Sequence, residues 1–207
     1  MKIFKTTVLL VAGLFLGTNS YSQNFDSLET AFAQSYSDEY IGDYSKAIDD
    51  LKKVYDENSY ETNLRLGWLT YMAGLFTESL SFYQKAIGLK PMSIEAKLGY
   101  VFPASATGKW ELVKKQYSDI LSIDPQNNTA NYRLGSIYYG NEDFTTAIKY
   151  FEKVVNLYPF DHDALLMYAW SNLKIGKTKE AEVLFHKVLL NTPDDSSALE
   201  GIGLIKK

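Results

Sequence analysis

The sequence contains no cysteine, which excludes disulfide bonds, thiol catalysis, cysteine metal sites and a lipid-modified cysteine. It also has no excess of basic residues, because 21 Lys and Arg stand against 25 Asp and Glu and give a formal net charge of −4. A dedicated nucleic-acid-binding protein is therefore not expected. Hydrophobic residues make up 46% of the 207 residues, which excludes a disordered chain.

Histidine is scarce, and the familiar catalytic motifs are absent. His162 and His186 have no metal-ligand spacing, so we expect both at the surface. There is no Gly-rich phosphate loop, no Gly-x-Ser-x-Gly and no His-Glu-x-x-His. We therefore predict a protein without enzymatic activity, with no catalytic residue, metal or cofactor.

Long apolar runs are missing as well. The run at residues 8–16 is too short for the ~20 residues of a membrane-spanning helix. Two lysines precede it, and Ser20-Tyr21-Ser22 places small residues at the two positions that signal peptidase reads. These features predict a signal peptide over residues 1–22, with cleavage before Gln23. An uncleaved membrane anchor is the alternative.

Cleavage at this point predicts an acidic, exported protein with no membrane span. Removal of Lys2 and Lys5 leaves 19 basic and 25 acidic residues, a net charge of −6. The run that ends in Tyr-Ser-Gln resembles the export signals of Bacteroidota-type bacteria. Because a lipobox cysteine is absent, we expect a periplasmic or secreted protein rather than an outer-membrane lipoprotein.

Proline is rare, but its spacing is regular. Four of the five prolines recur every 34 residues, at Pro91, Pro125, Pro159 and Pro193. Alignment on them divides most of the chain into ungapped units, which are residues 60–93, 94–127, 128–161 and 162–195. A further unit, 28–59, lacks the proline and ends two residues earlier, and residues 23–27 form a short lead before it.

Each unit has the pattern of a helical hairpin. In residues 131–155 apolar side chains recur at intervals of three and four, as in amphipathic helices. Residues 140–143 break the pattern between the two helices, and Pro159 ends the second helix. Neither helix can bury its apolar face alone, so neighbouring hairpins must stack.

Small residues mark the position at which the two helices of a hairpin cross. They form the pairs Ser35/Ala47, Gly67/Ser79, Gly135/Ala147 and Ala169/Ala181. Only Val101 and Val113 break this rule, so we expect a wider hairpin in residues 94–127.

Pro103 lies inside the predicted first helix of that same unit, where a proline removes a hydrogen bond and clashes with the preceding turn. Gly99, four residues earlier, leaves room for its ring. We expect a kink that either shapes a pocket near Phe102 or is a tolerated defect.

The period, the Leu66-Gly67 and Leu134-Gly135 pairs, the aromatic residue that opens the second helix and the terminal proline together resemble the tetratricopeptide repeat (TPR). The resemblance covers about residues 28–195, and Thr178 departs from it by replacing the opening aromatic residue. It implies an all-α, right-handed α-solenoid of about five hairpins plus a short C-terminal helix.

In TPR arrays the first helices line a concave groove. The family's groove positions select mainly aromatic and aliphatic residues in this sequence, with a thin acidic edge. The resemblance therefore implies a partner-binding groove formed by Tyr36, Tyr40, Leu64, Trp68, Tyr71, Phe102, Tyr132, Tyr139 and Trp170. Packing between adjacent first helices is the alternative, and it is favoured for Leu64, Leu98 and Leu166.

The function implied by the resemblance is that of an exported adaptor that binds a protein or an extended peptide. A glycan-binding surface in the cell envelope, built from the same aromatic residues, is the alternative. Exposure of Trp68 and Trp170 separates the two. The clamp that some TPR proteins use for peptide C-termini is absent, because Leu64 and Trp68 occupy its first pair of positions.

The last segment, residues 196–207, begins a sixth unit and stops. Asp194-Asp195 before it is typical of a helix N-cap. We expect a short helix that closes the stack, because solenoids need covered ends. An incompletely covered end would instead mediate self-association.

Overall fold

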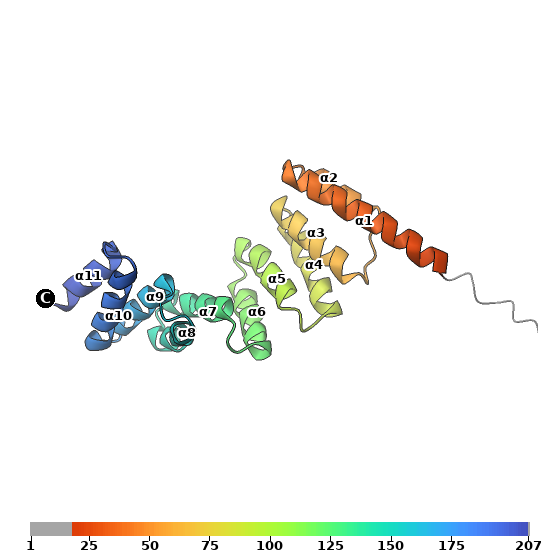
Figure 1. Cartoon of the computed structure of the whole chain (residues 1–207). Coiled ribbons are helices and arrows are strands. Elements are labelled where there is room, and N and C mark those ends of the chain that lie inside the picture. Colours follow the sequence, from red (N-terminus) through yellow and green to blue (C-terminus); the bar gives the residue numbers. More distant parts are fainter. Residues whose placement is uncertain (1–17, 207) are drawn as a thin grey trace, which may run out of the picture.

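The computed structural model describes the backbone of residues 18–206 and the side chains from Phe25 onward. These residues form eleven α-helices and no strand (Figure 1). The helices are α1 (Thr18–Tyr40), α2 (Tyr44–Lys52), α3 (Tyr60–Met72), α4 (Phe76–Leu89), α5 (Ile94–Ala106), α6 (Trp110–Ile123), α7 (Asn128–Gly140), α8 (Phe144–Leu157), α9 (His162–Lys174), α10 (Thr178–Asn191) and α11 (Ser196–Ile205).

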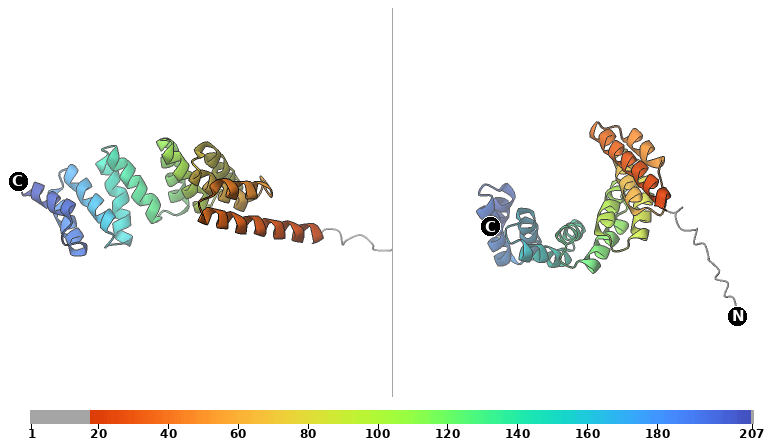
Figure 2. Two further views of the ribbon diagram at one scale, coloured as in Figure 1. Left: turned by 90° about the horizontal axis from the view of Figure 1, so that it is seen from above. Right: turned by 45° about the vertical axis from the view of Figure 1, so that its right-hand side comes forward.

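Consecutive helices pair as hairpins, from α1 with α2 to α9 with α10. Each second helix also packs against the first helix of the next hairpin, and α11 packs against α10 and α9. The chain is therefore an all-α, right-handed solenoid of five hairpins and a final helix, as predicted. Figures 1 and 2 show an extended arc with α1 at one end and α11 at the other.

From α3 onward, the first helix of each unit begins at a capping side chain that recurs every 34 residues. Each cap accepts a hydrogen bond from a backbone N–H three residues later. The bond satisfies one of the N–H groups that a helix start leaves without a partner. The caps are Ser59, Ser93, Asn127, Asp161 and Asp195.

The turn inside each hairpin requires a residue with left-handed backbone geometry. Gly74, Gly108 and Gly176 have φ angles of 76°, 68° and 81°, which glycine adopts without steric cost. Glu142 occupies the same place with a φ of 62°. This geometry costs a residue with a Cβ about 1–2 kcal/mol, so the predicted break at residues 140–143 is a strained turn.

Between α3, α4 and α5 the core is built around the Tyr83 ring, which lies between two glycines. A Cβ on Gly67 would lie 2.9 Å from the ring, and one on Gly99 would lie 2.2 Å from it. Ser79 Oγ donates to the Gly67 carbonyl oxygen at 2.7 Å, which confirms the close approach expected at this pair. The atoms nearest to a Cβ on Gly99 thus belong to Tyr83, so this ring also requires a glycine there. The room that Gly99 leaves for the Pro103 ring stays a prediction.

The α5–α6 hairpin differs at the crossing position. Val101 and Val113 are both buried there, in place of the small pair found elsewhere. α5 continues as one helix through Pro103, which is also buried. The predicted kink therefore does not interrupt the helix, and its angle stays a prediction.

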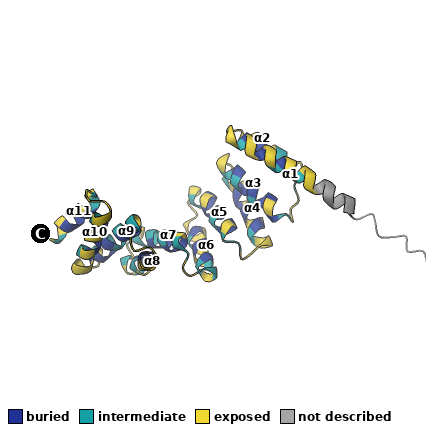
Figure 3. Cartoon of the chain, viewed as in Figure 1, coloured by how far each residue is buried: buried dark blue, intermediate teal, exposed yellow. Residues whose placement is uncertain are grey.

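Buried residues follow the helix contacts along the whole array (Figure 3). At the C-terminal end, Ala198 and Ile202 of α11 are buried in a core shared with Phe185. Leu199 and Leu204 on the same helix are exposed. α11 thus covers part of the last hairpin, and self-association through its exposed face stays a prediction.

The predicted signal peptide falls largely on residues 1–17, which lie outside the described residues. α1 begins at Thr18 and continues past the predicted cleavage point before Gln23. Cleavage stays a prediction. None of the described helices is long and apolar enough to cross a membrane.

Candidate functional site

The first helices α1, α3 and α5 enclose a groove of about 820 Å³ in the N-terminal half of the array. Its side chains come from successive units and are mostly apolar or aromatic. They include Phe32, Tyr36, Leu64, Trp68, Leu98 and Phe102. We refer to this site as the N-terminal groove.

Arg65 connects α3 to α1 at the edge of the N-terminal groove. Its Nη1 lies 2.5 Å from Glu39 Oε2, and its Nε donates to Ser35 Oγ at 3.2 Å. The guanidinium carbon lies 3.8 Å from the centroid of the Tyr36 ring. The Arg65 side chain is 8% exposed, so the Glu39 carboxylate compensates a charge that would be costly to bury alone.

The wall of the groove is a preassembled cluster of rings. Trp68 Nε1 donates to Glu39 Oε1 at 2.5 Å, which fixes the orientation of the indole. The Trp68 centroid lies 5.9 Å from that of Tyr71 and 6.2 Å from that of Phe102, and Tyr71 and Phe102 lie 5.5 Å apart. Such tilted and edge-on pairs are favourable, so these rings hold one another in place.

The rim of the groove is acidic. Glu61 pairs with Lys90 at 3.0 Å, and this bond holds the pKa of the Glu61 carboxyl below its usual value. The Tyr60 hydroxyl donates to Glu95 at 3.2 Å, and burial raises the pKa of Tyr60. Glu95 has no basic partner among residues 18–206.

The structure brings part of the predicted binding set together. Tyr36, Leu64, Trp68 and Phe102 all line the N-terminal groove, and Tyr71 supports it from the ring cluster. Tyr40 is 92% exposed and does not line it.

The remaining predicted residues lie apart, in the C-terminal half. Tyr132 packs edge-on against Phe151 at 5.8 Å, and Tyr139 against Phe144 at 5.1 Å. Trp170 packs on Phe185 at 5.2 Å and donates from Nε1 to Ser197 Oγ at 2.8 Å. These three rings are half-buried and act in packing between helices.

Residues 108–162 and 138–202 match two models of the tetratricopeptide repeat family. The chain is 26% identical over 162 residues to the TPR repeat-containing protein YpiA of Bacillus subtilis strain 168. The crystal structure of a tetratricopeptide repeat protein from Parabacteroides merdae ATCC 43184 superposes with a TM-score of 0.74, at 22% identity over 87% of this chain and 72% of that one. This chain is a tetratricopeptide repeat protein.

A second solved structure contains MamA of Desulfovibrio magneticus RS-1 from residue 41 to its end. It superposes with a TM-score of 0.69 at 20% identity, over 83% of this TPR chain and 98% of that one. Likeness at this identity shows the TPR fold alone. The aligned segment covers 76% of this chain and about 38% of the length of YpiA. TPR proteins are generally non-catalytic scaffolds for protein–protein interaction.

The TPR groove positions predicted aromatic residues that line the N-terminal groove, but they did not predict the contacts of Arg65 with Glu39 and Ser35. Glu39 and Ser35 lie one helical turn apart on α1, so both reach the same guanidinium. A signal was present, because the only two arginines of the chain, Arg65 and Arg133, occupy the same position of their units.

His162 was expected at the surface, but it is half-buried beside the N-cap of α11. Its Nδ1 lies 3.0 Å from Asp163 Oδ1, and its Nε2 lies 3.0 Å from Asp195 Oδ2. These bonds raise the pKa of His162. Among the described residues, no three His, Asp or Glu side chains are grouped as a metal site would require.

Proposed function

We propose that this TPR protein is an adaptor that binds an extended peptide segment of a partner protein in the N-terminal groove. The observation that carries the proposal is a concave groove of about 820 Å³, lined by first helices of three successive hairpins. Aromatic side chains from these helices supply contact area at little cost in conformational entropy.

The charges of the groove indicate what kind of segment it accepts. The Arg65 guanidinium already has a carboxylate partner in Glu39, so an acidic ligand gains little there. Glu95 on the rim has no basic partner among the described residues. The groove therefore suits a segment with apolar side chains and a basic residue at the rim.

The glycan alternative is less well supported. A sugar platform needs flat, exposed rings in a row. Trp68 and Trp170 are half-buried, pack against other rings and donate their indole N–H groups to the protein. These constraints favour a peptide or protein ligand.

Export remains part of the proposal, on the basis of the basic start, the short apolar run and the small residues before Gln23. N-terminal sequencing of the protein recovered from envelope fractions tests it. A mature chain that begins at Gln23 supports export, and an intact Met1 in the cytosolic fraction contradicts it.

The groove is tested with peptides selected on the mature protein from a phage-displayed library of random twelve-residue peptides. Selected peptides are synthesised with a fluorescent label and titrated by anisotropy. Tyr36→Ala removes a ring that lines the groove and is expected to weaken binding about tenfold or more. Tyr158→Ala is the matched control, because this tyrosine is equally exposed but lies outside the groove.

Circular dichroism verifies that both variants fold. Equal peptide affinity in wild type, Tyr36→Ala and Tyr158→Ala would show that the N-terminal groove is not the binding site. Selection of peptides without apolar residues would also argue against it.

A further inference from the structure

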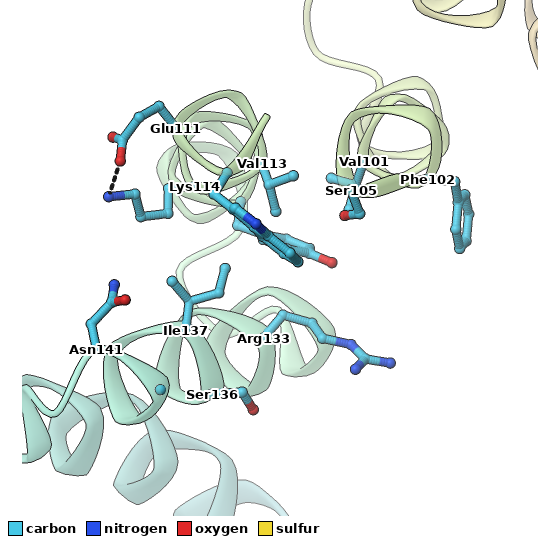
Figure 4. A pocket seen from close by; sticks show the side chains of 13 residues that line it. Val101, Phe102, Ser105, Glu111, Val113, Lys114, Arg133, Ser136, Ile137 and Asn141 are labelled. Atoms are coloured by element: carbon cyan, nitrogen blue, oxygen red, sulfur yellow. Dashed lines mark ion pairs between the residues drawn. The ribbon is translucent and has the colours of Figure 1, made fainter. Parts of the chain in front are cut away.

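A second cleft, of about 660 Å³, opens between α5, α6 and α7 (Figure 4). Val101, Val113, Tyr117 and Ile137 form its apolar part, and Trp110 lies on its rim with 55% of its surface exposed. We refer to it as the inter-repeat cleft. It shares Phe102 with the N-terminal groove and otherwise has its own residues.

The position of Arg133 in its unit is glycine at two other places in the array, where an aromatic ring fills the space. At α5 the equivalent residue is Gly99, and the Tyr83 ring fills the space of its missing side chain. At α11 it is Gly201, where a Cβ would lie 2.2 Å from the Phe185 ring. At Arg133 the side chain itself occupies this position, and Val101 and Val113 line the cleft beside it.

Arg65 and Arg133 occupy the same position of units 60–93 and 128–161, so their surroundings can be compared directly. Arg65 is held by three residues of the preceding first helix α1. The equivalent residues on α5 all line the inter-repeat cleft with Arg133. In this alignment Ser35, Tyr36 and Glu39 correspond to Val101, Phe102 and Ser105.

The carboxylate that compensates Arg65 is therefore missing at Arg133. Ser105 stands where Glu39 stands, and Arg133 makes no ion pair among residues 18–206. Among the described residues its guanidinium lies near one ring, that of Tyr132, at 5.8 Å from the centroid. The other charges of the cleft compensate each other, because Lys114 pairs with Glu111 at 2.6 Å.

Figure 4 shows how these charges are arranged. The Glu111–Lys114 pair lies at one end of the cleft, and Arg133 extends toward the other end, on the side of Ser105 and Phe102. The cleft thus presents one uncompensated guanidinium beside an apolar wall.

We propose that the inter-repeat cleft binds an acidic segment of a partner protein. A carboxylate of that segment takes at Arg133 the place that Glu39 takes at Arg65, and a neighbouring apolar side chain packs between Val113 and Ile137. The guanidinium fork matches a carboxylate with two parallel hydrogen bonds, and the apolar wall strengthens that contact by excluding water. A mostly exposed Trp110 supplies the kind of aromatic anchor that dominates protein interfaces.

The test introduces a carboxylate of the protein itself into the cleft. Ser105→Glu supplies the missing carboxylate on α5 and is expected to compete with the ligand for Arg133. Ser118→Glu is the control, because it adds the same charge on an exposed part of α6 outside the cleft. Arg133→Gln removes the guanidinium and keeps a polar side chain.

The probes are two pools of fluorescent hexapeptides with blocked ends and apolar residues around a central fixed position. One pool carries Asp or Glu at that position, and the other carries Asn or Gln. Wild type and Ser118→Glu are expected to bind the acidic pool about tenfold more tightly than the amide pool. Ser105→Glu and Arg133→Gln are expected to lose this preference.

Equal binding of the two pools to wild type, or no binding of either, would overturn the proposal. So would a preference that survives in Ser105→Glu. The alternative ligand is a second copy of this chain, and analytical ultracentrifugation tests for it. A wild-type dimer that Ser105→Glu converts to a monomer would mean that the acidic segment belongs to that second copy. The partner-protein proposal would then be wrong. These readouts use residues other than Tyr36, so they are independent of the N-terminal groove.

Discussion

Arg65 and Arg133 stand at the same position of their repeats but in opposite surroundings. Arg65 is buried, and Glu39 and Ser35 of the preceding first helix bind it. Arg133 is exposed beside Ser105 and Val101, and it borders a cleft of about 660 Å³. The comparison teaches that the position of a residue in a repeat does not set its role. The contact between two successive first helices is called a junction here. The junction at Arg65 is closed, because three residues of the preceding first helix contact the guanidinium. The junction at Arg133 is open, because the residues at the same three positions line a cleft.

The largest expected difference in stability is between substitutions of the two arginines. Arg65→Leu leaves the half-buried Glu39 carboxylate without its counter-charge and is expected to lower the free energy of unfolding by about 3 kcal/mol. Arg133→Leu breaks no ion pair, so a change within about 0.5 kcal/mol is expected. Urea unfolding followed by circular dichroism measures both. Equal losses would show that the two junctions are held in the same way.

Substitution of a glycine tests the packing of the Tyr83 ring against α5. Gly99→Ala places a methyl group where the buried Tyr83 ring lies and is expected to destabilise the protein by about 2 kcal/mol. Gly203→Ala is the control, because nothing lies within 4 Å of its Cβ position on α11. Alanine there improves helix propensity and is expected to stabilise by up to about 1 kcal/mol. Similar changes from the two substitutions, measured by thermal unfolding, would refute the packing of Tyr83 on α5.

A smaller effect is expected when the open junction is closed. Ser105→Glu adds to Arg133 the partner that Arg65 has and is expected to raise the free energy of unfolding by about 0.5–1 kcal/mol at low salt. Ser118→Glu is expected to change it little. Added salt should reduce the gain, because it screens an ion pair near the surface. A loss of stability in Ser105→Glu would mean that the side chain at position 105 does not reach Arg133.

The smallest expected effect concerns pH. His162 on α9 bonds to the N-cap of α11, and its contacts with Asp163 and Asp195 raise its pKa above the ordinary 6.5. The folded state therefore binds this proton more tightly than the unfolded state. The stabilisation is complete below about pH 6.5 and is lost as the pH rises through the raised pKa. Amide hydrogen exchange in α11, corrected for intrinsic rates, should thus accelerate above that range, and His162→Asn should remove this dependence.

The fold could be predicted from the sequence because its signals are local and repeated. Each signal lies within one hairpin: Pro159 ends a helix, the apolar spacing in residues 131–155 indicates two amphipathic helices, and the Gly67/Ser79 pair marks a helix crossing. Asp195 could likewise be recognised as an N-cap from three neighbouring residues.

The candidate sites were harder to predict, because they depend on contacts between units. Nothing near Gly99 in the sequence indicates that the Tyr83 ring packs against this glycine. From the sequence, Gly99 could be related only to Pro103, four residues later. Trp68 and Trp170 occupy the same repeat position, yet one lines a groove and the other packs under α11. Their hydrogen-bond acceptors, Glu39 and Ser197, lie in other units. Only comparison of equivalent positions across the folded units shows which charge lacks its partner.

The most direct test of the account uses the fact that the chain has two arginines, Arg65 and Arg133. Their side-chain Nε–H groups give two resolvable signals in an ¹H–¹⁵N spectrum at acidic pH. We expect Arg65 Nε–H, which donates to Ser35, to exchange slowly with solvent, and Arg133 Nε–H to exchange rapidly. Addition of the acidic peptide pool should shift and protect the Arg133 signal and leave that of Arg65 unchanged. Equal protection of the two signals in the free protein, or a shift of Arg65 alone, would contradict the account.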